Sequence, residues 1–207
     1  MIDYEPSLRS PSEDRLLLEE LTHRVSNELA SASGIVTAAA ARSSAAEVKV
    51  ALGRVRERLE GWAQVQVALQ MPDYDTLIDA STYLRQLCHA LMRSQINWHE
   101  IELSVRATPL QLHAVQCWRM GLIVAELVTN CARHAFSGNS GVISVELGNC
   151  PAGVECCVED NGSALVGVRP GRGLRIVAAL TQKLGGTLDQ RFGPRGTRST
   201  LTFPLVL

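Results

Sequence analysis

One histidine near the start of the sequence has neighbours that suit nucleophilic chemistry. His23, Arg24 and Asn27 lie in a stretch from Glu20 to Ala30 in which apolar residues recur at three- and four-residue steps. This spacing predicts an amphipathic helix that buries one stripe. His23 lies off that stripe, one helical turn before Asn27. Because such a helix holds the imidazole on its wet face, one ring nitrogen is presented to a reagent, and His23 is a candidate nucleophile.

A second set of polar residues follows on a long apolar helix predicted over residues 111–136. Its members lie at three- and four-residue steps and therefore share one face: they are Glu126, Asn130, Arg133 and His134. Polar side chains beside an apolar surface need water, a partner or a ligand. Magnesium takes amide or carboxylate oxygens and binds nucleotide phosphates, so a magnesium nucleotide would satisfy this face. A plain solvated surface is the more frequent use of such a pattern taken alone.

Two glycine-containing segments strengthen the nucleotide interpretation. Asp160 and Gly162 end a predicted strand, where the carboxylate can accept a hydrogen bond from a purine amine and the glycine admits close approach of the ring. Gly171 and Gly173 open a predicted helix, whose exposed N–H groups and dipole favour phosphate. Each signal alone is weak, but their order along the chain favours a nucleotide site.

These residues are carried by two predicted units. Residues 1–12 have no apolar periodicity and read as a flexible lead, residues 13–72 form a helical hairpin, and residues 73–207 form a layered α/β sandwich. The predicted fold class is therefore α+β. The expected helices cover residues 12–41, 48–71, 77–95, 111–136 and 174–184, and the expected strands cover residues 102–106, 142–147, 154–159, 187–192 and 199–204.

The apolar stripes of the hairpin predict an assembly. Two helices alone bury their stripes poorly, and pairing with a second copy gives a four-helix bundle. We therefore expect a homodimer through residues 13–70. An intramolecular bundle with later helices is the alternative, but the rest of the chain follows a different pattern.

Composition limits the class of partner. The chain has 207 residues, of which 46% are hydrophobic and 20% charged, and its formal net charge is -1. This charge argues against a broad grip on nucleic acid or on an anionic membrane. The six cysteines show no paired metal-binding spacing, so we expect reduced thiols. We also expect no signal peptide, no membrane anchor and a cytoplasmic location.

The second unit resembles the ATP-binding domain of the GHKL superfamily, in the form found in sensor histidine kinases. Glu126 to Phe136 is similar to the N box of that family. The resemblance implies that Asn130 binds magnesium and that Glu126 assists proton removal from the accepting histidine. It also implies that Arg133 and His134 lie near the phosphates of ATP.

Further motifs extend the resemblance over most of the chain. Asp160 and Gly162 match the G1 box, and Gly171 and Gly173 match the G2 box. The opening helix resembles the dimerisation and phosphoacceptor helix of kinases whose motif reads His-Arg-Val-Lys-Asn, with Ser26 in place of the lysine. The resemblance implies a two-component histidine kinase. ATP would phosphorylate His23, flanked by Arg24 and Asn27, and the phosphoryl group would pass to an aspartate of a response regulator receiver domain.

Two departures from the family pattern keep other functions open. Ala164 follows soon after Gly162 where a further glycine is common, and the loop over residues 163–170 is shorter than the family's lid over ATP. These departures favour an alternative, an ATP-independent phosphotransferase that relays phosphate between response regulators through His23. A third hypothesis is a binding protein that sequesters a regulator without histidine chemistry.

Overall fold

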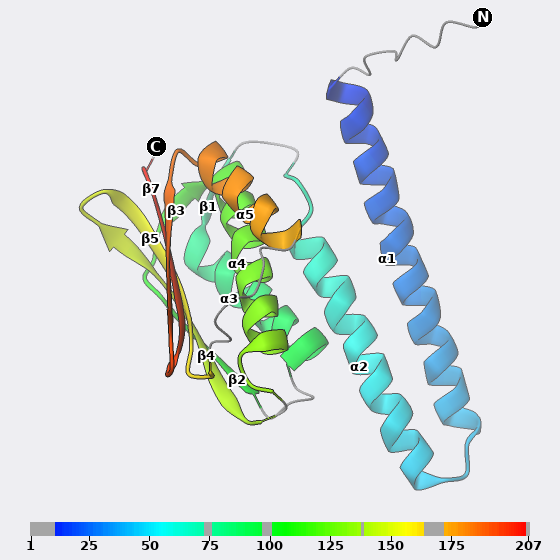
Figure 1. Cartoon of the computed structure of the whole chain (residues 1–207). Coiled ribbons are helices and arrows are strands. Elements are labelled where there is room, and N and C mark those ends of the chain that lie inside the picture. Colours follow the sequence, from blue (N-terminus) through cyan, green and yellow to red (C-terminus); the bar gives the residue numbers. More distant parts are fainter. Residues whose placement is uncertain (1–10, 73–75, 97–100, 138, 164–171, 206–207) are drawn as a thin grey trace, which may run out of the picture.

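The computed structural model describes residues 11–72, 76–96, 101–137, 139–163 and 172–205. Helix α1 (Pro11–Arg42) and helix α2 (Ala46–Ala68) run antiparallel as a hairpin (Figure 1). The predicted hairpin is confirmed, and its helices begin and end within three residues of the expected positions. The predicted flexible lead lies almost wholly outside the described residues.

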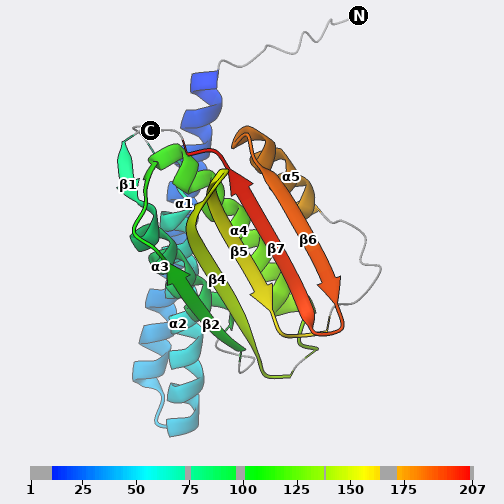
Figure 2. The same ribbon diagram turned by 90° about the vertical axis from the view of Figure 1, so that its left-hand side faces the viewer.

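A five-stranded sheet forms the frame of the second unit. Its strand order is β2-β4-β5-β7-β6, with β2 and β4 parallel and the other neighbours antiparallel. The helices α3, α4 and α5 cover one face, and the other face is open (Figure 2). The elements are β1 (Leu77–Asp79), α3 (Ala80–Leu91), a π-helix (Met92–Ile96), β2 (Ile101–Ala107), β3 (Gln111–His113), α4 (Ala114–His134), β4 (Gly141–Cys150), β5 (Gly153–Asp160), α5 (Arg172–Lys183), β6 (Thr187–Gly193) and β7 (Gly196–Phe203).

The core lies between the sheet and its helices. Alternate residues of β4 and β5 point inward, and Ile143 and Val154 are fully buried. Long apolar side chains of the helices, such as Leu84 and Met120, are also fully buried. On the open face, cross-strand ion pairs join Arg106 with Glu146 and Arg198 with Glu159. The predicted α/β sandwich is confirmed, with one wet face.

Two short strands were absent from the prediction. Residues 77–79 were assigned to a helix, but they form β1, which pairs with β3. Asp79 then begins α3, because its carboxylate accepts a hydrogen bond from Ser81 N at 3.0 Å and one from Thr82 Oγ1 at 2.6 Å. These hydrogen bonds lower the pKa of Asp79 from 3.8 to about 2. Residues 111–113 were likewise assigned to the helix that begins at Ala114.

The last turns of α2 dock on the second unit. Two side-chain donors reach its final carbonyls: Tyr83 Oη donates to Ala68 O at 3.1 Å and Trp118 Nε1 to Leu69 O at 2.9 Å. About two turns before this end of α2, Glu60 forms an ion pair with Arg93 at 3.1 Å. These contacts hold α2 against α3 and the π-helix, and Trp118 joins its end to α4.

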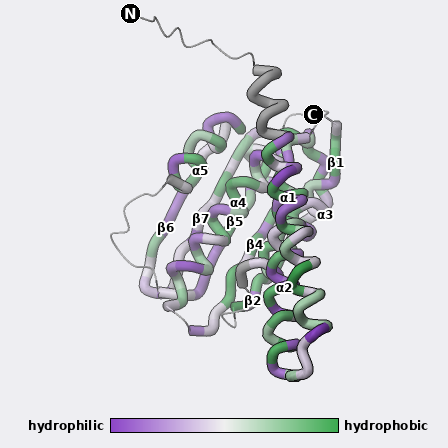
Figure 3. Tube along the Cα trace, turned by 90° about the vertical axis from the view of Figure 1, so that its right-hand side faces the viewer, coloured by the Kyte–Doolittle hydropathy of each residue, from purple (hydrophilic) through white to green (hydrophobic). Residues whose placement is uncertain are grey.

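Much of the hairpin surface is nevertheless apolar. Leu21 is 57% exposed on α1, and Val50 is 58% exposed on α2. Hydrophobic residues colour both helices of the hairpin in Figure 3. No helix within the described ranges is long and apolar enough to cross a membrane. All six cysteines are free thiols.

Candidate functional site

His23 is exposed on α1, as predicted. Its Nδ1 lies 3.2 Å from the side-chain amide nitrogen of Asn27, one turn further along. Arg24 instead turns back, and its Nε donates to Glu20 Oε1 at 2.9 Å. This hydrogen bond lowers the pKa of Glu20 and raises the pKa of Arg24. Asn27 therefore engages one ring nitrogen of His23 and leaves Nε2 directed elsewhere.

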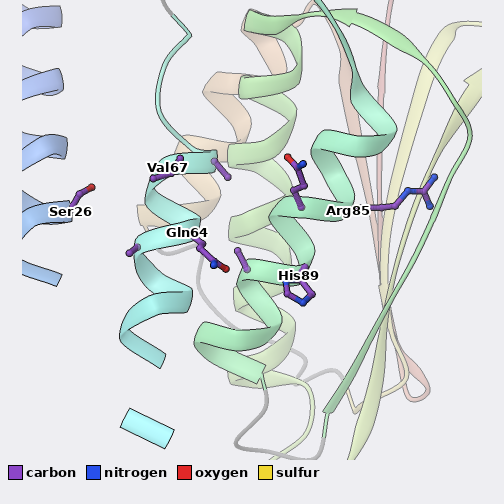
Figure 4. Close-up of a pocket in the computed structure, with 9 residues that line it drawn as sticks. Ser26, Gln64, Val67, Arg85 and His89 are labelled. Atoms are coloured by element: carbon purple, nitrogen blue, oxygen red, sulfur yellow. The ribbon is translucent and has the colours of Figure 1, made fainter. Parts of the chain in front are cut away.

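A groove of about 690 Å³ opens beside this part of α1. Figure 4 shows Ser26 of α1 on one side, Arg85 and His89 of α3 on the other side, and Gln64 and Val67 of α2 between them. The groove thus lies between the hairpin and the layered unit, one helical turn from His23. It contains none of the residues predicted to bind nucleotide.

Asp160 is the most informative residue of the predicted nucleotide site. It ends β5 and is only 3% exposed. Its Oδ1 accepts a hydrogen bond from Gly162 N at 3.0 Å. Within the part of the chain that the structure describes, its Oδ2 has no hydrogen-bond partner. A buried carboxylate oxygen without a donor is costly, so this atom is suited to an N–H donor from a ligand.

Glycine is required around Asp160 by protein packing. A Cβ on residue 162 would overlap the backbone of Ala135 at the end of α4, where Ser163 N donates to Ala135 O at 2.9 Å. Gly162 thus packs against the end of α4, and its role in admitting a ligand ring stays a prediction. Gly196, with φ +119°, packs against the backbone of Asp160 and begins β7.

Two residues near Asp160 were not among the predicted site residues. Gly196 was not identified because its contact with Asp160 joins strands distant in sequence. Cys131 lies on α4 beside the same carboxylate. Burial, and then the negative charge of Asp160, raise the pKa of its thiol. In the sequence, the position of Cys131 directly after Asn130 was the signal that could have identified it as a residue of the site.

The polar face of α4 divides into two parts. Glu126 and Asn130 are half-buried, whereas Arg133 and His134 are exposed in the last turn. Glu126 reaches the second helix of the site, since a Cβ on Gly173 would coincide with its carboxylate. The structure thus brings Glu126 to the first turn of α5. His23 lies on a different element, α1, which packs along α2.

Some predicted residues lie outside the described part of the chain. These are Gly171, Ala164 and nearly all of the short loop over residues 163–170. Among the described residues, no cluster of three or more histidine, cysteine or acidic side chains has metal-binding geometry. Magnesium needs no such cluster when a nucleotide supplies phosphate oxygens, so a single amide oxygen from Asn130 fits its coordination.

Two protein families match the chain in succession. The family described as "Histidine kinase" matches residues 20–95, which contain His23, and the family described as "Histidine kinase-like ATPase domain" matches residues 97–203. The second match alone covers more than half of the chain. Its range includes Glu126, Asn130 and Asp160.

Known proteins with similar sequence or fold agree with these matches. Blue-light-activated histidine kinase 2 of Erythrobacter litoralis is 28% identical over 201 residues, which are 91% of this chain and 57% of the relative. The chain thus spans little more than half the length of that relative.

Two solved structures show the same fold. A histidine kinase domain from Erythrobacter litoralis has a TM-score of 0.64 at 22% identity, over 88% of this chain and 96% of that one. A structure titled as a bacterial phosphotransferase has a TM-score of 0.63 at 12% identity, over 95% and 98% of the two chains. At these identities the likeness concerns the fold alone.

Proposed function

This chain belongs to the histidine kinase-like ATPase domain family and carries the two modules of a sensor histidine kinase core, and from this premise we propose that it phosphorylates its own His23 from ATP. The observation that carries the proposal is the unpartnered Oδ2 of Asp160, buried at the end of β5. A 6-amino purine supplies the N–H donor that this atom lacks. His23 supplies an exposed imidazole on the other unit.

The phosphates of ATP would lie between α4 and α5. The first turn of α5 offers backbone N–H groups and the positive end of the helix dipole. Asn130 would hold Mg²⁺, and Arg133 and His134 lie at the end of the same helix face. When bound, Mg²⁺ neutralises charge on the phosphates during transfer. Gly171 and Gly173 stay predictions as phosphate-binding residues.

The imidazole of His23 is the nucleophile in this proposal. The side-chain amide nitrogen of Asn27 faces Nδ1 and can only donate, so the neutral imidazole carries its proton on Nε2, and Nε2 becomes nucleophilic when that proton is removed. Nε2 then attacks the γ-phosphorus, the bond from this phosphorus to the bridging oxygen breaks, and ADP leaves with the electron pair. Glu126 is assigned to accept the ring proton that is lost. Arg24 lies beside His23 and offers positive charge.

The proposal includes a homodimer through residues 13–70 and a response regulator. Exposed apolar side chains such as Leu21 and Val50 support a second copy that covers the hairpin. The phosphoryl group would then pass from His23 to an aspartate of a receiver domain in the cytoplasm. Residues 1–12, 13–72 and 73–207 are the corresponding lead, phosphoacceptor unit and ATP-binding unit.

A second candidate function is favoured by one contact. The carboxylate of Glu126 already fills the first turn of α5, beside Gly173, where phosphates would bind. A chain that keeps this contact would not bind ATP and would act as a phosphotransferase, receiving phosphate on His23 from one response regulator and passing it to another. The unit around Asp160 would then have a structural role.

Calorimetric titration with Mg²⁺ and ATP tests the nucleotide step. We expect saturable binding by the wild type, and weakening of about tenfold to a hundredfold in Asp160→Asn, because the amide places a donor where an acceptor is needed. Asp189→Asn is the matched control, since Asp189 is exposed on β6 and pairs with Arg191. If the wild type binds no ATP, the autokinase proposal is wrong and the phosphotransferase candidate takes its place.

A further inference from the structure

The side chain of Glu126 contacts helix α5, although the sequence resemblance assigns its carboxylate to proton removal from His23. A Cβ added to Gly173 would overlap both Oε1 and Cδ of Glu126. Gly173 is the second residue of α5, so the carboxylate lies in the first turn of that helix. Helices α4 and α5 pack against each other along this contact. Glycine at position 173 therefore leaves space that Glu126 fills.

This position is electrostatically favourable for an anion. The first backbone N–H groups of a helix have no partner within the helix, and the helix dipole adds partial positive charge there. A carboxylate stabilises this end for the same reason that a phosphate does. Two anions in one turn repel each other, so Glu126 and a phosphate exclude one another from it.

At the other end of the candidate site, one carboxylate oxygen of Asp160 lacks a hydrogen-bond partner within the described part of the chain. Asp160 is nine-tenths buried or more, and its Oδ2 has no partner among the described residues. The site thus has an unsatisfied acceptor for a base at Asp160 and a resident anion at Gly173. The base of a nucleotide can pair with Asp160 only after the phosphates displace the carboxylate of Glu126 from the first turn of α5.

We propose that Glu126 is a built-in competitor of the nucleotide's phosphates, held in the first turn of α5 until nucleotide binding expels it. This proposal rests on the proposed ATP site. Expulsion frees the same carboxylate that is assigned to accept a proton during transfer to His23. Nucleotide binding and release of the proton acceptor are thereby one event.

The test compares ligands with and without phosphate. ATP and adenosine are titrated by calorimetry into the full chain, in EDTA and again with Mg²⁺. The variants are Glu126→Gln, which removes the charge, and Glu126→Asp, whose shorter side chain retreats from the turn. Glu102→Gln is the control for loss of one negative charge, because Glu102 is exposed on β2. Thermal unfolding of each variant checks that it folds.

The expected result is specific to phosphate. In EDTA, Glu126→Gln and Glu126→Asp bind ATP about two- to fivefold more tightly than the wild type does, which is the range of a charge at a helix end. Adenosine affinity stays the same in every variant, and Glu102→Gln matches the wild type for both ligands. Autophosphorylation falls in Glu126→Gln despite tighter binding, because the proton acceptor is gone.

Three other results would overturn the competitor role, each in a different way. If ATP binds the wild type and Glu126→Gln equally in EDTA, Glu126 does not compete, and the proposed ATP site stands. If ATP binds neither the wild type nor any folded variant, the proposed function fails and the competitor role falls with it. A gain in adenosine affinity equal to the gain for ATP contradicts a phosphate-specific effect.

Discussion

The hairpin and the layered unit differ in how their apolar residues are used. Every buried apolar residue of the described chain lies between Ala80 and Phe203, in the layered unit. In the hairpin, the only residue that the structure buries among described side chains is Gly61. The layered unit has a core of its own. The described part of the hairpin has none, so its stability depends on the docking of α2 and on the proposed second copy that covers its exposed apolar stripes. The same substitution should therefore change the stability of the single chain much more in the layered unit than in the hairpin.

Leu84→Ala and Leu21→Ala make this comparison with one chemical change. Leu84 is fully buried, and its truncation should lower the free energy of unfolding by about 2–5 kcal/mol. Leu21 is 57% exposed in the single chain, so its truncation should change the value by less than about 0.5 kcal/mol at low protein concentration. Denaturation with urea, followed by circular dichroism, measures both.

Protein concentration separates the single chain from the proposed dimer. If a second copy covers the hairpin, the loss in Leu21→Ala grows as concentration rises, because the wild type gains stability from association. Sedimentation of the two proteins reports the same difference directly. A loss that is large at every concentration would mean that Leu21 is buried within the single chain.

The docking of α2 can be tested with two glycines on the same helix. A Cβ on Gly61 would lie 2.7 Å from Ser94 N and 2.9 Å from Arg93 C, so Gly61→Ala should destabilise the protein by about 1–3 kcal/mol. Gly53 has nothing within 4 Å of the same position, and Gly53→Ala should stabilise it by about 0.4–1 kcal/mol. Thermal unfolding compares them. Equal effects would show that α2 is not docked at Gly61.

The smallest effect concerns acid stability of the layered unit. The pKa of Asp79 falls from 3.8 to about 2 because Thr82 and Ser81 donate to its carboxylate. A lowered pKa gives stability that is fully present above the ordinary value and is lost as the pH falls through the folded value. The midpoint of thermal unfolding should therefore decrease less between pH 4 and pH 2 in Asp79→Asn than in the wild type. Parallel curves would contradict this role of Asp79.

Long periodic elements could be predicted from the sequence, and short ones could not. The stripes of α1 and α2 and the alternation in β4 and β5 repeat often enough to distinguish helix from strand. Strands β1 and β3 have three residues each, too few to show a period, and each adjoins a helix. Their pairing joins distant parts of the chain, so they were included in the neighbouring helices.

The candidate site also has residues that the sequence could identify and contacts that it could not. Asp160 was identifiable because a carboxylate at a strand end followed by glycine is a local pattern. The contacts of Glu126 with Gly173, and of Gly196 with Asp160, arise from packing between elements distant in sequence. Periodicity identified the polar face of α4, but it carried no information on which of its residues would be buried. The roles of all these residues in catalysis or binding stay predictions.

Transfer of labelled phosphate tests the central claim most directly. The full chain is incubated with Mg²⁺ and ATP labelled in the γ-phosphate, and acid-labile label on the protein is measured in wild type, His23→Ala and His89→Ala. His89 is an exposed histidine on α3 and serves as the matched control. The account predicts label on the wild type and on His89→Ala, and none on His23→Ala. Equal label on His23→Ala, or no label on the wild type, would contradict it.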